Sequence, residues 1–167
     1  MTDAYHPRRA AYIAGLVSLG GFLFGFDASV ISGVVGFIVP EFSLNELQVG
    51  LVVGAPTIGG ILAGLTGGPL ADYIGRKSVL LILAALYTVS AIGSALAPNF
   101  ETLVVARAIG GLAFASLSIA PMYIAEIAPH DRRGFLVSFN QFNIMIGFSV
   151  AYFANYFVLQ LSQVDLH

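Results

Sequence analysis

Residues 20–33 read GGFLFGFDASVISG and place one carboxylate, Asp27, among glycine, aromatic and aliphatic residues. Almost nothing nearby in the sequence can solvate its charge. Asp27 therefore either caps a helix in a soluble core or lies inside a membrane, where a buried charge usually has a function. The apolar run around it extends from about residue 10 to residue 39. Since ~20 helical residues already cross the ~30 Å hydrocarbon core of a bilayer, this length favours the membrane interpretation.

The composition of the whole chain also indicates a membrane protein. Of its 167 residues, 57 % are hydrophobic and 10 % are charged, and the mean hydropathy is +0.88. This is more apolar than a soluble domain of that length can bury. The net charge of −2 provides no basic surface for nucleic acid. The chain has no cysteine, and His6, His130 and His167 are far apart, so we expect no disulfide, no metal site and no cofactor.

Five apolar runs are long enough to span a bilayer. They cover about residues 10–39, 47–71, 78–97, 102–125 and 135–161. The breaks between them are short and hold proline, asparagine and charged residues, and no linker separates a second domain. The sequence therefore predicts an all-α, polytopic bundle of about five transmembrane helices, in one domain over residues 1–167.

The basic residues predict the orientation of this bundle, because Lys and Arg remain preferentially on the cytoplasmic side of a membrane. Alternate breaks carry all but one of the seven basic residues, and the breaks between them carry none. These residues are Arg8, Arg9, Arg76, Lys77, Arg132 and Arg133. We therefore expect a multi-pass protein of the cell's plasma membrane with its N-terminus in the cytoplasm.

The remaining basic residue, Arg107, lies within a span at a depth similar to that of Asp27. Asp27 is about 16 residues, or ~24 Å, above the cytoplasmic start of its helix, and Arg107 is ~5 residues, or ~8 Å, below the outer end of the fourth run. An isolated charge there costs ~3 to more than ~10 kcal/mol, so we expect the two to pair. Protonation of Asp27 then releases Arg107 and acts as a switch. In the alternative, Arg107 extends to the outer interface and Asp27 is a static packing residue.

Glycines at four-residue spacing predict close contacts between helices. They occur at Gly60, Gly64 and Gly68 in the second run and at Gly21 and Gly25 in the first. Small residues at this spacing let helix backbones approach closely in lipid. We expect most of the 19 glycines to serve this packing.

The break after the second run, GPLADYIGRKS at residues 68–78, is the most specific stretch. Leu70 and Arg76 stand where a nucleotide-binding P-loop needs its first glycine and its lysine, so no nucleotide site is expected. Gly75 predicts a tight turn. Arg76 and Lys77 then lie at the inner surface, where they can bind acidic groups.

GPLADYIGRKS resembles the loop between helices 2 and 3 of the major facilitator superfamily, and YIAEIAPHDRRG at residues 123–134 resembles the end of helix 4 in its sugar porter branch. LFGFDASVISG at residues 23–33 is similar to helix 1 of bacterial proton-sugar symporters, and SFNQFNIMIG at residues 138–147 resembles helix 5. The resemblance covers nearly the whole chain and implies the N-terminal half of a transporter with about twelve helices in two halves. We therefore expect this chain to be an incomplete fragment.

The resemblance implies roles for individual residues. Asp27 becomes the proton-coupling carboxylate and Arg107 its partner. Phe24 packs on the sugar ring, and Gln141 binds sugar hydroxyls, since ligand clefts combine aromatic walls with a few polar groups.

Further roles follow from the same resemblance. Phe148 stands where related transporters carry a second amide, so Asn140 and Asn143 are alternative sugar ligands, unless they bond a neighbouring helix instead. A cytoplasmic charge network is expected to steady the outward-open state. Its members are Asp72, Arg76, Lys77, Glu126, Arg132 and Arg133.

The expected function is secondary active transport of a monosaccharide, coupled to protons by alternating access. Its partners are the sugar, protons, the lipid bilayer and the missing C-terminal half. One alternative is a passive sugar facilitator, which does not need Asp27 opposite Arg107, and another is a membrane remnant that transports nothing. An enzyme is not expected, because no catalytic groups or metal ligands converge at one depth.

Overall fold

The computed structural model describes residues 7–164, and these residues form helices without any strand. The elements are α1 (Pro7–Glu41), α2 (Glu46–Ile74), α3 (Arg76–Ala95), α4 (Phe100–Leu112), the 3-10 helix η1 (Ala113–Ala115), α5 (Ser116–Ile127) and α6 (Arg133–Val164). The described residues contain five helical spans that are long and apolar enough to cross a membrane, one of which consists of α4, η1 and α5. The prediction of an all-α, polytopic bundle is confirmed.

Apolar side chains cover the outside of the bundle as well as its interior. Tyr12, Ile61, Leu65 and Leu81 are among the large hydrophobic side chains that are mostly exposed. Such a surface suits contact with lipid tails. In lipid each backbone N–H and C=O group needs a hydrogen-bond partner inside its own segment, and a helix provides that partner.

Polar residues at the breaks start and stop the helices. Asn45 caps α2 through a reciprocal capping box with Gln48, and Asn99 caps α4 by accepting a hydrogen bond from the Thr102 amide. Gly75 joins α2 to α3 with a φ of 87°, a left-handed conformation that favours glycine. The tight turn that was predicted at Gly75 is therefore present.

The fourth span is not one continuous α-helix. It changes to a 3-10 turn at Ala113–Ala115 between α4 and α5. The change directly follows Gly110 and Gly111, which lie against Ser90 of α3 and Pro56 of α2. A 3-10 turn inside a helix often marks a strained or hinge position. Here the turn that precedes it is in close contact with both α3 and α2.

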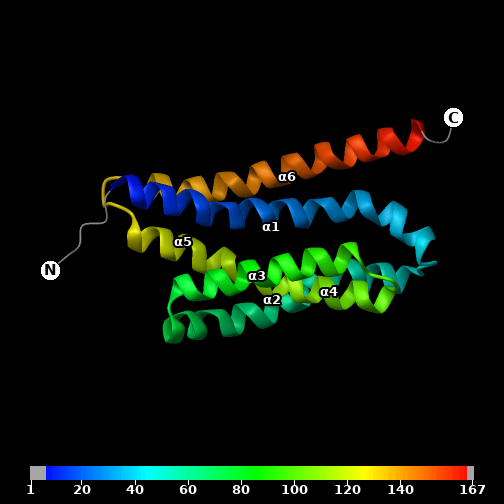
Figure 1. Ribbon diagram of the computed structural model, residues 1–167, viewed down its shortest axis with the longest axis horizontal. Helices are drawn as coiled ribbons and strands as arrows, with labels where there is room; N and C mark the ends of the chain where they lie inside the picture. The colour runs from blue at the N-terminus through cyan, green and yellow to red at the C-terminus, as the bar shows by residue number, and fades with distance from the viewer. Residues whose placement is uncertain (1–6, 165–167) are drawn as a thin grey trace.

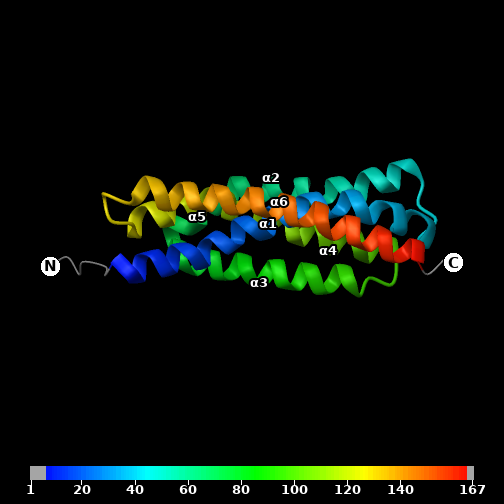
Figure 2. The same cartoon turned by 90° about the horizontal axis from the view of Figure 1, so that it is seen from above.

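The helices form two groups joined by α5. α1 packs mainly on α6, whereas α2 and α3 pack mainly on α4, and α5 contacts α1, α6 and α3 (Figure 1). Figure 2 shows α3 on one side of the bundle and α2 and α6 on the other.

The contact between α1 and α6 depends on glycine. A Cβ atom at Gly25 would collide with the Ile144 carbonyl oxygen, and one at Gly147 would collide with the Phe22 carbonyl oxygen. A Cβ atom at Gly21 would lie 3.0 Å from the Asn140 carbonyl oxygen. The close approach that was predicted at Gly21 and Gly25 is confirmed.

The packing stripe of α2 is one residue away from the predicted one. Nothing lies within 4 Å of an added Cβ at Gly64 or Gly68, so the prediction was wrong for these two glycines. The buried stripe runs through Gly59, Ala63, Gly67 and Ala71 instead. The two stripes have the same spacing, and of the predicted one only Gly60 meets a neighbour, the Phe114 ring of η1.

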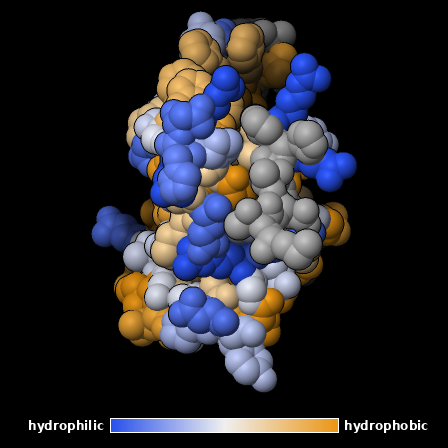
Figure 3. All heavy atoms as spheres, turned by 90° about the vertical axis from the view of Figure 1, so that its left-hand side faces the viewer, coloured by the Kyte–Doolittle hydropathy of each residue, from blue (hydrophilic) through white to orange (hydrophobic). Residues whose placement is uncertain are grey.

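Charged side chains gather at one end of the bundle. α3 and α6 begin at this end, which is also where α1 begins (Figure 1). Figure 3 looks at it directly and shows hydrophilic side chains across the end with hydrophobic ones around them. The basic residues of the alternate breaks thus share one end, here called the basic end.

Candidate functional site

The structure brings Asp27 of α1 and Arg107 of α4 together inside the apolar spans. Nη1 of Arg107 lies 3.5 Å from Oδ1 of Asp27. The Arg107 side chain is 9 % exposed and that of Asp27 is 26 % exposed. The distance exceeds the ~2.7–2.9 Å of a tight charge-assisted hydrogen bond. The pair therefore forms a single, loose contact between α1 and α4.

A backbone carbonyl of α2 holds the other side of the guanidinium. Nε of Arg107 donates a hydrogen bond of 3.2 Å to the Val52 carbonyl oxygen. In a regular helix this carbonyl accepts the N–H of the residue four positions later, but that residue is Pro56, which has no N–H. Pro56 thus frees an acceptor inside the bundle, and Arg107 occupies it.

A cavity of about 290 Å³ adjoins the ion pair, between α1, α3 and α4, and its walls combine polar and apolar side chains. Asp27 and Arg107 line it together with Tyr87, Ser90 and Ser94 of α3. We call it the outer cavity, because its remaining walls extend toward the end of the bundle opposite the basic end. The cavity gives Asp27 a polar surrounding on the α3 side.

Phe24 lies one turn before Asp27 in α1 and contacts a second aromatic ring. Its ring meets that of Phe114 in η1 edge to face, with 4.8 Å between the centroids. A Cβ atom at Gly60 of α2 would lie 3.1 Å from the Phe114 ring, so Gly60 leaves the room that this ring needs. Phe24 does not line the outer cavity.

The three amides of α6 have different environments. Gln141 is exposed, whereas Asn140 is 2 % exposed and packs against Gly21 of α1. Oδ1 of Asn140 has no hydrogen-bond partner among the described residues. Nδ2 of Asn143 donates to the Phe139 carbonyl of its own helix at 3.2 Å. Gln141 therefore points away from the bundle, whereas Asn140 lies in the contact between α6 and α1.

The expected charge network is only partly assembled. Nη1 of Arg76 lies 2.9 Å from Oε1 of Glu126, which links the start of α3 to the end of α5. Arg132 forms a longer contact of 3.8 Å with its neighbour Asp131, and both side chains are mostly exposed. Nε of Arg133 is buried without a hydrogen-bond partner in the described part of the chain.

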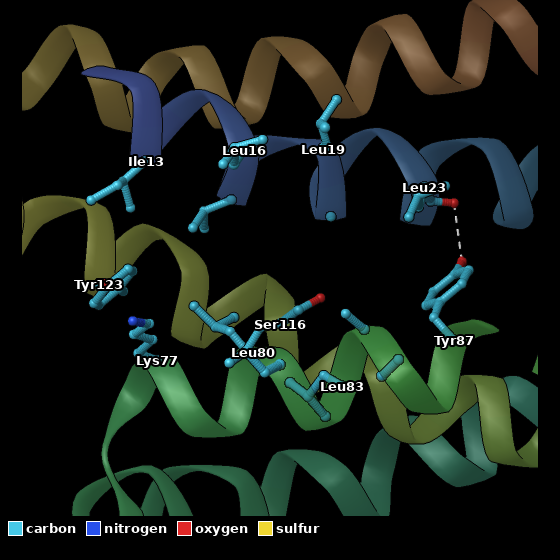
Figure 4. Close-up of a pocket in the computed structure, with 15 residues that line it drawn as sticks. Ile13, Leu16, Leu19, Leu23, Lys77, Leu80, Leu83, Tyr87, Ser116 and Tyr123 are labelled. Carbon is cyan, nitrogen blue, oxygen red and sulfur yellow. Dashed lines mark hydrogen bonds between the residues drawn. The ribbon is translucent and has the colours of Figure 1, made fainter. Parts of the chain in front are cut away.

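Two other expected members of that network form no ion pair within residues 7–164. Asp72 is exposed near the end of α2. Lys77 lines a second, apolar cavity of about 400 Å³ between α1, α3 and α5. We call this one the inner cavity (Figure 4). No group of three or more His, Cys, Asp or Glu side chains in the described residues is placed to hold a metal ion.

The sequence analysis missed two residues at the ion pair. The signal for Pro56 is present in the sequence, because a proline inside a helix always leaves the carbonyl four residues earlier without its helical donor. Tyr87 has no such signal. It reaches the site because α3 packs on α4, and its hydroxyl donates a hydrogen bond of 3.0 Å to the Leu23 carbonyl of α1.

A bundle of apolar spans with an ion pair between two of its helices and a cavity beside that pair is typical of polytopic membrane transporters. Comparison with known proteins defines the family. Residues 13–166 match the family described as sugar (and other) transporter, and the chain belongs to this family.

Several relatives of the chain are bacterial proteins named as sugar transporters. The chain is 44 % identical over 140 residues to the D-xylose transporter of Levilactobacillus brevis, covering 83 % of this chain and 31 % of that protein. It is 37 % identical over 186 aligned positions to the D-xylose-proton symporter of Escherichia coli strain K12, and this match covers 95 % of this chain and 38 % of that protein. The inward-open structure of the E. coli xylose transporter superposes with a TM-score of 0.79 at 36 % identity, covering 89 % of this chain and 40 % of that one. The chain thus spans about a third of the length of these curated relatives.

Proposed function

We propose that these helices belong to a proton-coupled monosaccharide transporter and carry its coupling pair, Asp27 and Arg107. The observation that supports this most directly is the contact between the two residues across α1 and α4. Intramembrane charges are costly and usually mark ion or substrate pathways. A relative at 37 % identity is named a D-xylose-proton symporter, which suits a carboxylate that takes up protons.

In the proposed coupling step, the contact between Asp27 of α1 and Arg107 of α4 breaks and forms again. When Asp27 takes up a proton, its charge disappears and its attraction for Arg107 falls. Arg107 retains the Val52 carbonyl as an acceptor, so it stays with α2 while α1 is released. Loss of the proton restores the contact. Alternating access then follows as a shift between two populated states of the bundle.

The proposed sugar contacts lie away from this pair. Phe24 offers an aromatic face backed by Phe114, and Gln141 offers an exposed amide on α6. Neither residue lines the outer or the inner cavity. In a major facilitator protein the substrate lies between two six-helix halves. We therefore propose that sugar binding also needs groups from a second half and that the five helices alone transport nothing.

The proposed orientation places the basic end in the cytoplasm of the cell, with the N-terminus on the same side. The segregation of Lys and Arg to the ends where α1, α3 and α6 begin supports it. The ion pair of Arg76 with Glu126 then joins two helix ends at the inner surface, where it steadies the outward-open state.

The test uses the protein expressed from its complete reading frame in vesicles with an imposed pH gradient. We expect uptake of a labelled pentose or hexose to follow the gradient. Asp27→Asn should abolish accumulation and spare exchange of sugar across the membrane. Glu101→Gln is the matched control, since it removes the same charge from an exposed acid at the start of α4.

The outcomes separate the candidate functions. Uptake that ignores the gradient, stops at equal sugar concentrations on the two sides and survives Asp27→Asn points to a passive facilitator and refutes the coupling role. Absence of uptake for every sugar supplied refutes transport itself.

A further inference from the structure

The inner and outer cavities lie in line along the groove between α1 and α3. The inner cavity is lined mainly by leucine and other apolar residues, with Lys77 at the end nearest the basic end (Figure 4). The outer cavity contains the ion pair. Tyr87 is the one residue that lines both. It therefore stands where the leucine-lined inner cavity meets the cavity that holds the ion pair.

The outer cavity has the size and the polar groups that water requires. A volume of about 290 Å³ corresponds to several water molecules at ~30 Å³ each. Each buried water needs two to four polar partners, and the cavity supplies Asp27, Arg107, Tyr87, Ser90 and Ser94. Its apolar wall includes Ile38 and Phe42, near the end of α1 that lies away from the basic end.

Tyr87 ties α3 to the turn of α1 that carries Asp27. Its hydroxyl donates to the Leu23 carbonyl at 3.0 Å, and Figure 4 shows this bond at one end of the inner cavity. Leu23 is four residues before Asp27, so the same carbonyl is the helical acceptor of the Asp27 amide. One carbonyl therefore receives two donors, and the position of the Asp27 turn depends on both.

We propose that the outer cavity is a water-filled route by which protons reach Asp27 from the outer side and that Tyr87 closes its inner end. This rests on the function proposed above for Asp27. The titratable and charged groups that face Asp27 are Arg107 from α4 and Tyr87 from α3, while α6 carries no acidic residue and no lysine or histidine. Phe24 and Gln141 lie outside this cavity, so the proposed proton route does not pass the proposed sugar contacts.

These 167 residues contain no cysteine, so single cysteines placed among them, with any cysteine elsewhere in the expressed protein replaced, report water along α3. Ala91 lines the outer cavity, while its neighbour Ile92 is 55 % exposed on the outside of the bundle. Ala91→Cys and Ile92→Cys are therefore matched in depth. Since only the hydrated thiolate reacts, we expect a charged, membrane-impermeant methanethiosulfonate added outside to label Ala91→Cys at least ~10-fold faster than Ile92→Cys. Equal rates overturn the water-filled cavity.

A third cysteine tests the role of Tyr87. Ala84 lines the inner cavity beyond Tyr87, so Ala84→Cys should resist the outside reagent. In the same background, Tyr87→Ala should raise its labelling by roughly tenfold, because the reagent then passes the boundary. Tyr87→Phe keeps the ring and should leave Ala84→Cys protected. Fast labelling with Tyr87 intact, or no change with Tyr87→Ala, overturns the closure.

These labelling results are independent of transport. Fast labelling at residue 91 together with uptake that ignores pH overturns the proton role and the coupling proposal but leaves a hydrated cavity. Slow labelling of Ala91→Cys together with proton-driven uptake overturns the proposed proton route and leaves the coupling role of Asp27 in place.

Discussion

Replacing Gly25 by alanine tests the contact on which the position of Asp27 depends. The change adds one methyl group to α1, two residues before Asp27. The new Cβ atom would collide with the Ile144 carbonyl oxygen and would lie 3.1 Å from both the Ile144 carbonyl carbon and the Phe148 amide nitrogen. These are backbone atoms of α6, so no side chain can rotate away. The two helices must separate.

The magnitude follows from two opposing terms. Overpacking a tight contact costs ~1–3 kcal/mol. Alanine in place of glycine inside a helix returns ~0.5–1 kcal/mol. The difference is ~0–2.5 kcal/mol. We therefore expect Gly25→Ala to lower the free energy of unfolding by ~1 kcal/mol, near the middle of that range, which reduces the ratio of folded to unfolded protein roughly fivefold.

Gly15→Ala is the matched control on the same helix, because nothing lies within 4 Å of its added Cβ atom. It should be neutral or should stabilise the protein by up to ~1 kcal/mol. Equilibrium unfolding in mixed micelles, followed by circular dichroism, measures both variants. If Gly25→Ala unfolds at the same denaturant concentration as Gly15→Ala, α1 and α6 do not pack as closely as described, and the reasoning is refuted.

Two further predictions concern contacts of the site. Glu126→Arg places two cations together and should slow uptake. The exchanged pair, Arg76→Glu with Glu126→Arg, should recover part of the rate in the same uptake assay. If the exchanged pair recovers none of the rate, a direct role for the ion pair is contradicted. Pro56→Ala supplies an N–H that competes with Arg107 for the Val52 carbonyl. Accumulation should fall although the protein stays folded, since alanine is favoured over proline inside a helix by ~3 kcal/mol and the lost bond costs only ~1–3 kcal/mol. Unchanged accumulation alongside unchanged unfolding would show that this carbonyl does not position Arg107.

The spans were predictable because a bilayer sets the length and the composition of each helix. The packing stripe of α2 was not. Gly60, Gly64 and Gly68 have the same four-residue spacing as Gly59, Ala63 and Gly67, so spacing predicts that a stripe exists without showing which one meets a neighbour. The pairing of Asp27 with Arg107 was predictable as a match in depth, because helix rise converts residue number into height.

The sequence by itself determined the five spans, the segregation of basic residues to one end and the heights of the two intramembrane charges. Each of these follows from local periodicity and from the thickness of a bilayer. Only the tertiary structure decided that Val52 would hold Arg107, that Tyr87 would bond to Leu23 and that Asn140 would lie buried against Gly21. Rotation of each helix about its axis chooses these contacts, and that rotation is set by how neighbouring helices pack rather than by any one segment.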